Sequence, residues 1–504
     1  MFLSKKYFET IIPIVLLAGF LLYLLYWRWQ VSQLRFFDAD EFTHLHWAAH
    51  VARGQLPYID FFTYFSPGFM WLLTPLFWFF GVSWQIFLAA RGLEFGIFTL
   101  LLGAVSLLFG VTRSWRWAVL PAVILAFLPL PYDKFLEVRP DTIATLFGCI
   151  GLLAEAVAIG KKGPRIRWWV TSGFFYGLSV IFLVKMTPFV IVGTGVAGLV
   201  SFQKKSIREL KAFMLGLFIP PAGLSIWAVL TGTFSAMWQA LLISPFTIFN
   251  NLKDNYMAPY LFFYPNSAFY GNGERISAGL LVNHMLWLGA LGVGTYRLLT
   301  PYVRARGNRD GVYVEILLAL TFVLVAAGYI KFFPSKYSQY LIPVAVFVAY
   351  YAADGLSLFF DWLISEGGYT SMVIVMGAFV YLLVIVSQSV YAPKIIAANT
   401  FQRLEFNRLV ASVPLSSRVV DLDGRMIFWK EGYSVCCLPF DDYLPYVSRA
   451  PQSLALYLSS HPADYVYQGD SNRLAGLLPE NQAYVKSHFT PVPGFGDRLW
   501  KRNQ

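Results

Sequence analysis

The sequence predicts an α-helical polytopic membrane protein of about 11 transmembrane helices, with interfacial helices in its first outer loop and a small C-terminal α/β soluble domain. Three observations predict this class. Apolar residues make up 57% of the 504 residues and charged residues only 13%, whereas globular domains contain about 25% charged residues. Apolar runs of about 20 residues, the length of a helix that crosses a bilayer, recur along the chain. From residue 392 onward the composition becomes mixed and polar.

Basic residues give the chain a formal net charge of +11. In a soluble protein this excess could indicate nucleic-acid binding, but in a membrane protein basic residues collect in cytoplasmic loops. Lys5 and Lys6 therefore predict a cytoplasmic N-terminus. The apolar stretch after them is too long for a signal peptide and lacks a small-residue cleavage site. We expect a retained first span, a multi-pass protein of the inner (cytoplasmic) membrane in contact with membrane lipids, and no nucleic-acid partner.

Hydropathy and basic loops together order the predicted spans. Five basic loops fall on one predicted face, which supports the order more strongly than any single loop does. The weakest point is the loop 355–369, which holds Asp361 and Glu366 and neither Lys nor Arg. The predicted spans are residues 9–28, 88–110, 117–131, 142–159, 168–185, 187–202, 212–230, 277–297, 311–330, 339–354 and 370–390.

Residues 68–83 are apolar but short for a crossing, which needs about 20 residues. Counting them as a span would also reverse the side of every later loop. We therefore predict an interfacial or re-entrant helix here, within a first outer loop that covers residues 29–87. Long structured loops of this kind are usually functional.

Residues 392–504 predict a soluble domain on the outer face, after a transmembrane domain of residues 1–391. Short apolar runs at 418–424 and 465–467, a turn at the end of the first run and a helix candidate at 454–458 predict an α/β fold. The domain has neither a Gly-rich phosphate loop nor a nucleophile elbow. We expect it to act as a lid or an acceptor-binding domain rather than as an independent enzyme.

The three cysteines give little information about function. Cys149 lies in a predicted span. Cys436 and Cys437 are adjacent, which makes them poor partners for an ordinary structural disulfide. Neither position shows the spacing of a metal site.

Ionisable residues are most concentrated just after the first span. From Asp38 to His46, nine residues include three acids and two histidines. If a helix begins after Asp38 as its N-cap, Asp40 and His44 share one face, because residues four apart are neighbours on a helix. A nearly opposite face is basic and suits phosphate or lipid headgroups; a solvated amphipathic helix in the interface explains the pattern equally well. The basic face consists of His46, His50 and Arg53.

Asp38 and Asp40, separated by one residue, match a pattern that can hold a divalent cation through carboxylate oxygens, although so short a match is weak. His44, His46 and His50 could suggest zinc. Their positions on different helix faces argue against one shared site. We therefore predict no certain cofactor and leave open a divalent cation at Asp38 and Asp40.

Two further outer segments carry charged residues. Asp60 is the only acid in an aromatic loop that otherwise suits packing at the headgroup level. The loop 131–141 holds five charges in nine residues, among them Arg139 and Asp141. Asp141 opens a span, where the helix dipole favours an acid even without a catalytic role.

Three lysines lie at predicted outer ends of spans, where basic residues are less usual. They are Lys185, Lys331 and Lys336. Snorkelling of the side chain explains one or two of them. An anionic ligand at the outer membrane surface would explain all three.

Several of these motifs occur in an order that resembles the type-C glycosyltransferases. The resemblance covers residues 30–345 and is strongest to the bacterial branch with the aminoarabinose transferases of lipid A and the rhizobial core-sugar transferases; protein O-mannosyltransferases are more distant. The motifs are an acidic pair after the first span, the stretch 54–61, Ser66-Pro67, Arg91, Arg139-Pro140-Asp141, Lys185 and the stretch 340–343.

The resemblance implies a polyprenyl-phosphate sugar donor and transfer at the outer face of the membrane to a lipid, glycan or protein acceptor. It implies that Asp40 is the catalytic base, with Glu41 as the alternative, and that Asp141 helps to shape the site. Many relatives carry an acid or a histidine pair just before the proline that Pro67 matches. This chain has neither there, so the role of that position is open, and Asp60 is a candidate to compensate.

The chemistry of such a transfer suits these residues. An acceptor hydroxyl needs a base, for which Asp40 is placed with His44 or Glu41 to orient it. The departing phosphate needs cations, and a single in-line displacement would invert the anomeric centre. The predicted substrate-binding residues are His44, Asp60, Arg139, Lys185, Lys336 and Tyr340.

A transporter or flippase of lipid-linked sugars is the main alternative, and a non-catalytic scaffold is a third. A transporter should carry ionisable groups near the middle of its spans. In this sequence the acids cluster at outer span ends, with Glu94 and Glu155 as exceptions. Arg91 could pair with Glu94, one helical turn away.

Overall fold

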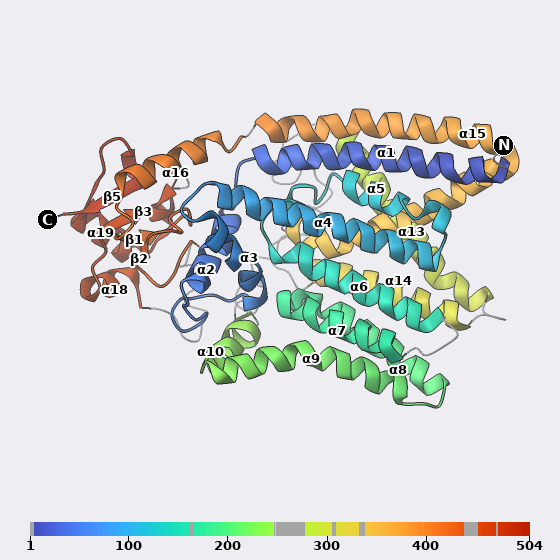
Figure 1. Cartoon of the computed structure of the whole chain (residues 1–504), viewed down its shortest axis with the longest axis horizontal. Helices are drawn as coiled ribbons and strands as arrows, with labels where there is room; N and C mark the ends of the chain where they lie inside the picture. The colour runs from blue at the N-terminus through green and yellow to red at the C-terminus, as the bar shows by residue number, and fades with distance from the viewer. Residues whose placement is uncertain are drawn as a thin grey trace.

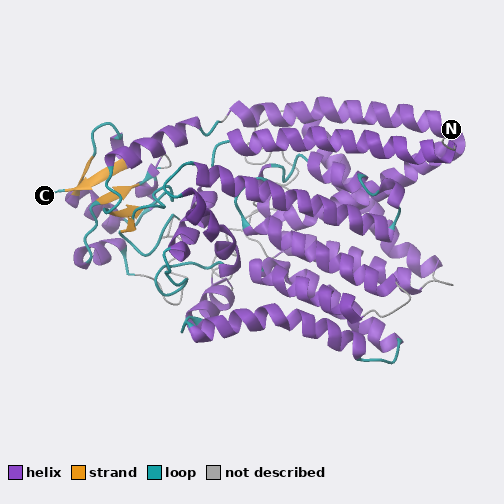
Figure 2. Ribbon diagram, in the orientation of Figure 1, coloured by secondary structure: helices purple, strands orange, loops and turns teal. Residues whose placement is uncertain are grey.

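The computed structural model is a bundle of long helices with a small α/β domain at one end, and the two chain termini lie at opposite ends of the molecule (Figure 1). It describes residues 5–160, 166–245, 247, 278–304, 309–331, 338–396, 398–437, 452–469 and 472–503. Within these residues all named strands belong to the C-terminal domain, and helices build the rest (Figure 2). The predicted fold class is confirmed.

Helices in the membrane part follow the predicted order. Seven described helices, with α15 taken as one, are long and apolar enough to cross a membrane. The remaining predicted spans coincide with helices that are shorter or less apolar. The helices up to α15 are α1 (Lys5–Leu34), α2 (Ala39–Ala52), α3 (Pro67–Phe80), α4 (Gln85–Thr112), α5 (Leu120–Phe127), α6 (Pro140–Gly160), α7 (Ile166–Phe182), α8 (Thr187–Gln203), α9 (Arg208–Leu230), α10 (Phe234–Trp238), α13 (Ala278–Arg304), α14 (Arg309–Lys331) and α15 (Ile342–Ile396).

The predicted loop 355–369 is largely helical, which corrects the sequence prediction. Helix α15 is two helices joined at Gly368, where φ is 74°, a left-handed conformation that glycine adopts readily. Asp361 lies 3.6 Å from the Arg116 guanidinium and accepts a hydrogen bond from the Trp117 indole at 3.0 Å. The segment 355–369 has no Lys or Arg of its own, and Arg116 of the neighbouring basic loop provides its basic partner.

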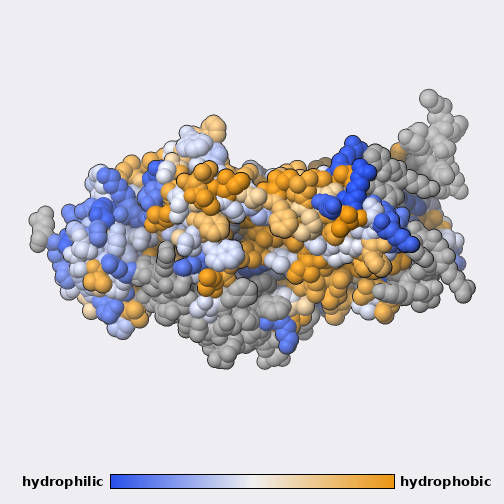
Figure 3. Space-filling model, turned by 90° about the horizontal axis from the view of Figure 1, so that it is seen from below, coloured by the Kyte–Doolittle hydropathy of each residue, from blue (hydrophilic) through white to orange (hydrophobic). Residues whose placement is uncertain are grey.

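Residues 29–87, the predicted first outer loop, contain two short helices, α2 and α3, between the bundle and the C-terminal domain (Figure 1). Helix α3 has 14 residues, too few to cross a bilayer. Its Trp78 and Phe79 side chains are 70% and 82% exposed, which suits a helix in the lipid interface. On the face shown in Figure 3, apolar residues are concentrated on the bundle and polar residues on the C-terminal domain.

The C-terminal domain contains a five-stranded mixed sheet in the order β2-β1-β3-β5-β4. Strand β1 is parallel to β2 and β3, and β5 is antiparallel to β3 and β4. Its elements are α16 (Thr400–Ser412), β1 (Arg418–Asp421), β2 (Lys430–Glu431), α18 (Leu454–Ser460), β3 (Tyr465–Tyr467), α19 (Pro479–His488), β4 (Phe489–Pro491) and β5 (Leu499–Arg502). Alternate strand residues such as Val420 and Val466 are buried beneath the helices in a separate apolar core.

A turn after β1 brings this domain against α2. The Asp421 carboxylate accepts hydrogen bonds from the backbone of Asp423, Gly424 and Met426. A Cβ atom at position 424 would lie 2.8 Å from the Phe42 Cβ, and φ there is 98°. Only glycine fits this close approach without strain.

Two expectations fail at this interface. The basic face of α2 meets the C-terminal domain instead of lipid headgroups: His46 and His50 are buried, and Arg53 donates to the carbonyls of Ile427 and Trp429. Cys436 and Cys437 form a disulfide, with Cα atoms 3.7 Å apart. The usual range for disulfides is about 4.4–6.8 Å, so neighbouring cysteines were not expected to pair.

Candidate active site

Helix α2 begins as the sequence predicted, with Asp38 as its N-cap. The Asp38 carboxylate accepts from the Asp40 amide at 3.0 Å, and the Glu41 carboxylate accepts from the Asp38 amide at 2.9 Å. This capping box satisfies amides that the first helical turn leaves unpaired. It fixes which way the two neighbouring acids point.

Glu41 points into the protein and is fully buried. Its two oxygens lie 2.6 and 2.8 Å from Arg91 nitrogens, and one of them also accepts from the Val138 amide at 3.1 Å. Arg91 donates in addition to three carbonyl groups at the end of α1. The predicted pairing of Arg91 with Glu94 is therefore wrong, because a bidentate partner 50 residues away outcompetes the helical neighbour.

Asp40 points the other way and shares Arg139 with Asp141. Its side chain is 38% exposed, and one carboxylate oxygen lies 2.5 Å from an Arg139 nitrogen. The Arg139 Nε lies 3.6 Å from the Asp141 carboxylate, whose side chain is 3% exposed. The structure thus brings three predicted site residues together, from residues 29–87 and 131–141, around one guanidinium.

Charged residues that sequence reasoning did not single out extend this cluster. Glu137 accepts from Lys134 at 2.7 Å and from Arg35 at 3.0 Å. Burial by itself would raise the pKa of Asp38, but Lys134 and Arg139 outweigh burial and hold that pKa below its usual range. For Lys134 and Glu137 the sequence signal was the high charge density of the loop 131–141.

Two buried polar atoms of the cluster have no hydrogen-bond partner among the described residues. They are the Arg139 Nε and the Asp141 Oδ1. Buried polar groups are nearly always paired with protein, water or ligand. These atoms mark where a polar substrate group could bind.

Lys185 lies near the same cluster, between α7 and α8. Its ammonium is 3.5 Å from the centre of the Tyr340 ring, a cation–π contact. It is also within electrostatic range of Asp141, Arg139 and Asp40. Lys336, which was also predicted to bind substrate, lies outside the described residues.

His44 packs among aromatic rings, and Asp60 bonds within its own loop. The His44 ring is buried edge-on against Trp47, Phe65 and Phe69, with ring centres 5.0–5.5 Å apart. Burial, and then the nearby Arg139, lower its pKa to about 3, so this imidazole is neutral at physiological pH. Asp60 is exposed and accepts from the Leu56 amide at 2.7 Å within its own loop. Substrate binding by these two residues stays a prediction.

The neutral His44 predicts a pH-dependent stability difference. Its folded pKa of about 3 lies below the unfolded value of 6.5, so only the unfolded chain gains this proton as the pH falls through that window. Between pH about 7.5 and about 5, wild type should lose about 2 kcal/mol more stability than His44→Phe. Thermal unfolding of both proteins across this range measures the difference, and parallel losses would contradict it.

The acidic pair Asp38 and Asp40, left open as a divalent-cation site, is paired with side-chain cations in this structure. Lys134 lies 3.4 Å from Asp38, and Arg139 lies 2.5 Å from Asp40. A cation at this pair stays a prediction. Among the described residues, groups of three close metal-ligand atoms include neither acid.

No model of a known protein family matches the sequence, and no curated protein matches it. Solved structures do match its fold. ArnT from Cupriavidus metallidurans, bound to undecaprenyl phosphate, aligns over 97% of both chains with a TM-score of 0.60 and 12% identity. ArnT is a type-C glycosyltransferase. The chain has the type-C glycosyltransferase fold.

A second protein with this fold is the oligosaccharyltransferase AglB from Archaeoglobus fulgidus. With a tethered acceptor peptide it aligns over 99% of this chain and 74% of its own, with a TM-score of 0.53 and 13% identity. With an inhibitory peptide and dolichol-phosphate the TM-score is 0.51 and the identity 14%, over 99% of this chain and 75% of AglB. A third AglB structure, with a TM-score of 0.50 and 13% identity over 96% of this chain and 73% of AglB, contains zinc and sulfate. The type-C fold is therefore common to neighbours that hold lipid phosphates.

Proposed function

We propose that the protein transfers a sugar from a polyprenyl-phosphate donor to a lipid, glycan or protein acceptor in the cell envelope, at the outer face of the cytoplasmic membrane. The observation that carries this proposal is Arg139, which holds Asp40 and Asp141 together beside Lys185. This group combines a partly exposed carboxylate with cations at one end of a membrane bundle. The lipid phosphates bound to ArnT and AglB support a donor of this class.

Asp40 is the general base of the proposed reaction. It is the more accessible of the two adjacent acids, at 38% side-chain exposure. Both oxygens of the neighbouring Glu41 are taken by Arg91 and the backbone, so it acts as a positioning residue for the start of α2. Arg139 orients the Asp40 carboxylate. A partly exposed carboxylate can accept the acceptor's proton.

The proposed step is a single displacement at the anomeric carbon. The acceptor oxygen forms a bond to this carbon and gives its proton to Asp40. The bond from the carbon to the phosphate oxygen breaks, and its electron pair leaves with the lipid phosphate. Arg139 and Lys185 stabilise the negative charge that develops on the phosphate. Such a displacement inverts the anomeric centre.

Envelope glycans of a strain that lacks this protein test the proposal. We expect mass spectrometry to find one sugar missing, and wild-type protein to restore it. Reconstituted vesicles then separate transfer from transport. Movement of a polyprenyl-phosphate sugar across the vesicle membrane without a glycosylated product would refute the transferase and support the flippase.

Lys185 predicts an effect on donor binding. In Lys185→Gln the Michaelis constant for the lipid-phosphate donor should rise about tenfold, because one charge-assisted contact to phosphate is worth about 1.5–3 kcal/mol. Initial-rate kinetics in detergent measure the constant. Lys204→Gln, at an exposed lysine paired with Glu209, is the control. Equal Michaelis constants for both variants would remove Lys185 from the donor site.

A further inference from the structure

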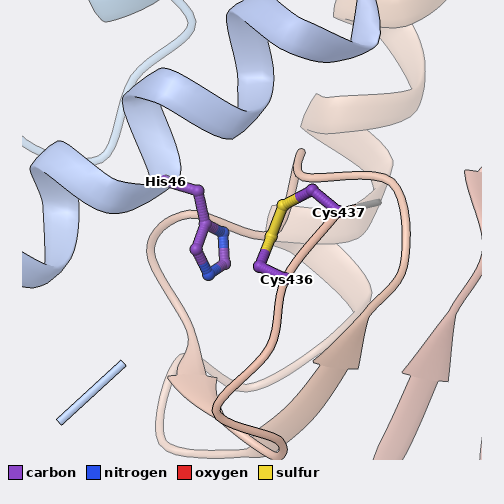
Figure 4. Close-up of side chains that lie close together, drawn as sticks. All are labelled: His46, Cys436 and Cys437. Carbon is purple, nitrogen blue, oxygen red and sulfur yellow. A yellow bond between two sulfur atoms is a disulfide. The ribbon is translucent and has the colours of Figure 1, made fainter. Parts of the chain in front are cut away.

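The basic face of α2 meets strand β2 in a cluster that the proposed reaction does not use. His46 and His50 stand one helical turn apart, with side chains 6% and 1% exposed. The His50 Nε2 lies 3.4 Å from the Glu431 Oε1, and the His46 Nε2 lies 3.9 Å from the same oxygen. Figure 4 shows His46 turned from α2 toward the loop that follows β2.

The facing atoms of this cluster are all electron-pair donors. The His50 Nδ1 is 2.6 Å from the Gln55 amide oxygen, which accepts a hydrogen bond only if Nδ1 carries the proton. In the tautomer with its proton on Nδ1, the His50 ring turns an unprotonated Nε2 toward the carboxylate. Neither the His50 Nε2 nor the Glu431 Oε1 has a hydrogen-bond partner among the described residues, and the His46 ring faces the Gly424 backbone. Buried lone pairs that face one another repel unless a cation lies between them.

We propose that His46, His50 and Glu431 bind a divalent transition metal of the zinc class. Ligand atoms at about 2.0–2.1 Å from a tetrahedral Zn²⁺ lie about 3.3–3.4 Å apart. The observed separations of 3.4 and 3.9 Å approach this spacing. All three ligand atoms lie within 4.8 Å of one another. Two imidazoles and a carboxylate are a common zinc ligand set, which leaves a fourth position for water.

The groups around the site orient its ligands as zinc sites require. Gln55 fixes the tautomer of His50, and the Asp421 carboxylate lies 3.6 Å from the His46 Nδ1. A carboxylate behind a metal-bound histidine is a recurring arrangement. Cys436 and Cys437 also lie within 4.8 Å of His46, but their disulfide leaves no thiolate to bind metal. The nitrogen and oxygen atoms therefore form the site.

This metal would join the helix that carries Asp40 to the C-terminal domain. Two ligands come from α2 and the third from β2, more than 370 residues later in the chain. The inference does not depend on the proposed reaction, because it rests only on the buried His46 and His50 and the partly buried Glu431. Its test therefore measures metal content and not sugar transfer.

The experiment uses the full chain purified in detergent with its disulfide intact. Plasma mass spectrometry should find about one Zn²⁺ per chain, and His50→Gln and Glu431→Gln should each weaken zinc binding about 10–100-fold. His461→Gln, at an exposed histidine of the same domain, should keep its zinc. The Cys436→Ser/Cys437→Ser double variant should also keep it. Loss of zinc from that double variant would overturn the proposed ligand set.

Chelation of wild type tests the site without relying on variants that fold. Dipicolinate should lower the thermal unfolding midpoint, and added Zn²⁺ should restore it, because a ligand that binds only the folded chain stabilises it. Co²⁺ in place of Zn²⁺ should give the visible absorption of a tetrahedral site. A chain that takes up no zinc after stripping and reloading, with no change in midpoint, overturns the proposal and leaves a proton between His50 and Glu431.

Discussion

Asp40→Asn should abolish sugar transfer while leaving the protein folded. A positioned general base contributes about 10²–10⁴-fold to a rate, so the transfer rate of this variant should fall by that factor. The side chain keeps its size, and its remaining oxygen can still accept from Arg139, at 2.5 Å in the native protein. Transfer by purified protein in reconstituted vesicles gives the rate, and thermal unfolding shows that the fold is intact.

The control for this variant removes the same charge elsewhere. Asp497→Asn changes an exposed acid of the C-terminal domain, and it should transfer sugar at the wild-type rate. Asp40→Glu adds a second comparison, because it keeps the base but moves it by one methylene. An Asp40→Asn rate within about tenfold of wild type would exclude Asp40 as the base.

Local patterns in the sequence predicted most of the helices and part of the site. Hydropathy and flanking basic residues are local signals. The spans and their order can therefore be predicted segment by segment along the sequence. The N-cap Asp38 follows in the same way, because a capping box involves residues only three apart. Asp40, Arg139 and Asp141 come together because both outer loops start or end at the same end of the bundle.

Long-range partners were the part that the sequence could not predict. Helical spacing offered Glu94 to Arg91, yet Glu41 of another segment has better bidentate geometry. Spacing also grouped His46 with His50 on one face, but it could not show that a distant strand would cover that face. The covering strand supplies Glu431 and turns an apparent lipid-binding stripe into a buried cluster.

Glu41→Gln should destabilise the protein strongly. Glu41 and Arg91 form a buried ion pair in which both side chains are at most 1% exposed. Removing one partner of such a pair costs about 3–5 kcal/mol, because it leaves the other charge buried and uncompensated. Arg91→Met should cost a similar amount. The double variant should lose less than the sum, since neither charge then remains. Unfolding in detergent of the wild type, both single variants and the double variant measures the coupling.

The same variants decide between the two adjacent acids. If Asp40 is the base, Asp40→Asn transfers sugar much more slowly but is nearly as stable as wild type. Glu41→Gln loses stability, and the fraction that stays folded still transfers sugar. The reverse pattern, a stable but inactive Glu41→Gln beside an active Asp40→Asn, would assign the proton to Glu41. It would also require Arg91 to release that carboxylate during the reaction, because the present geometry occupies both of its oxygens.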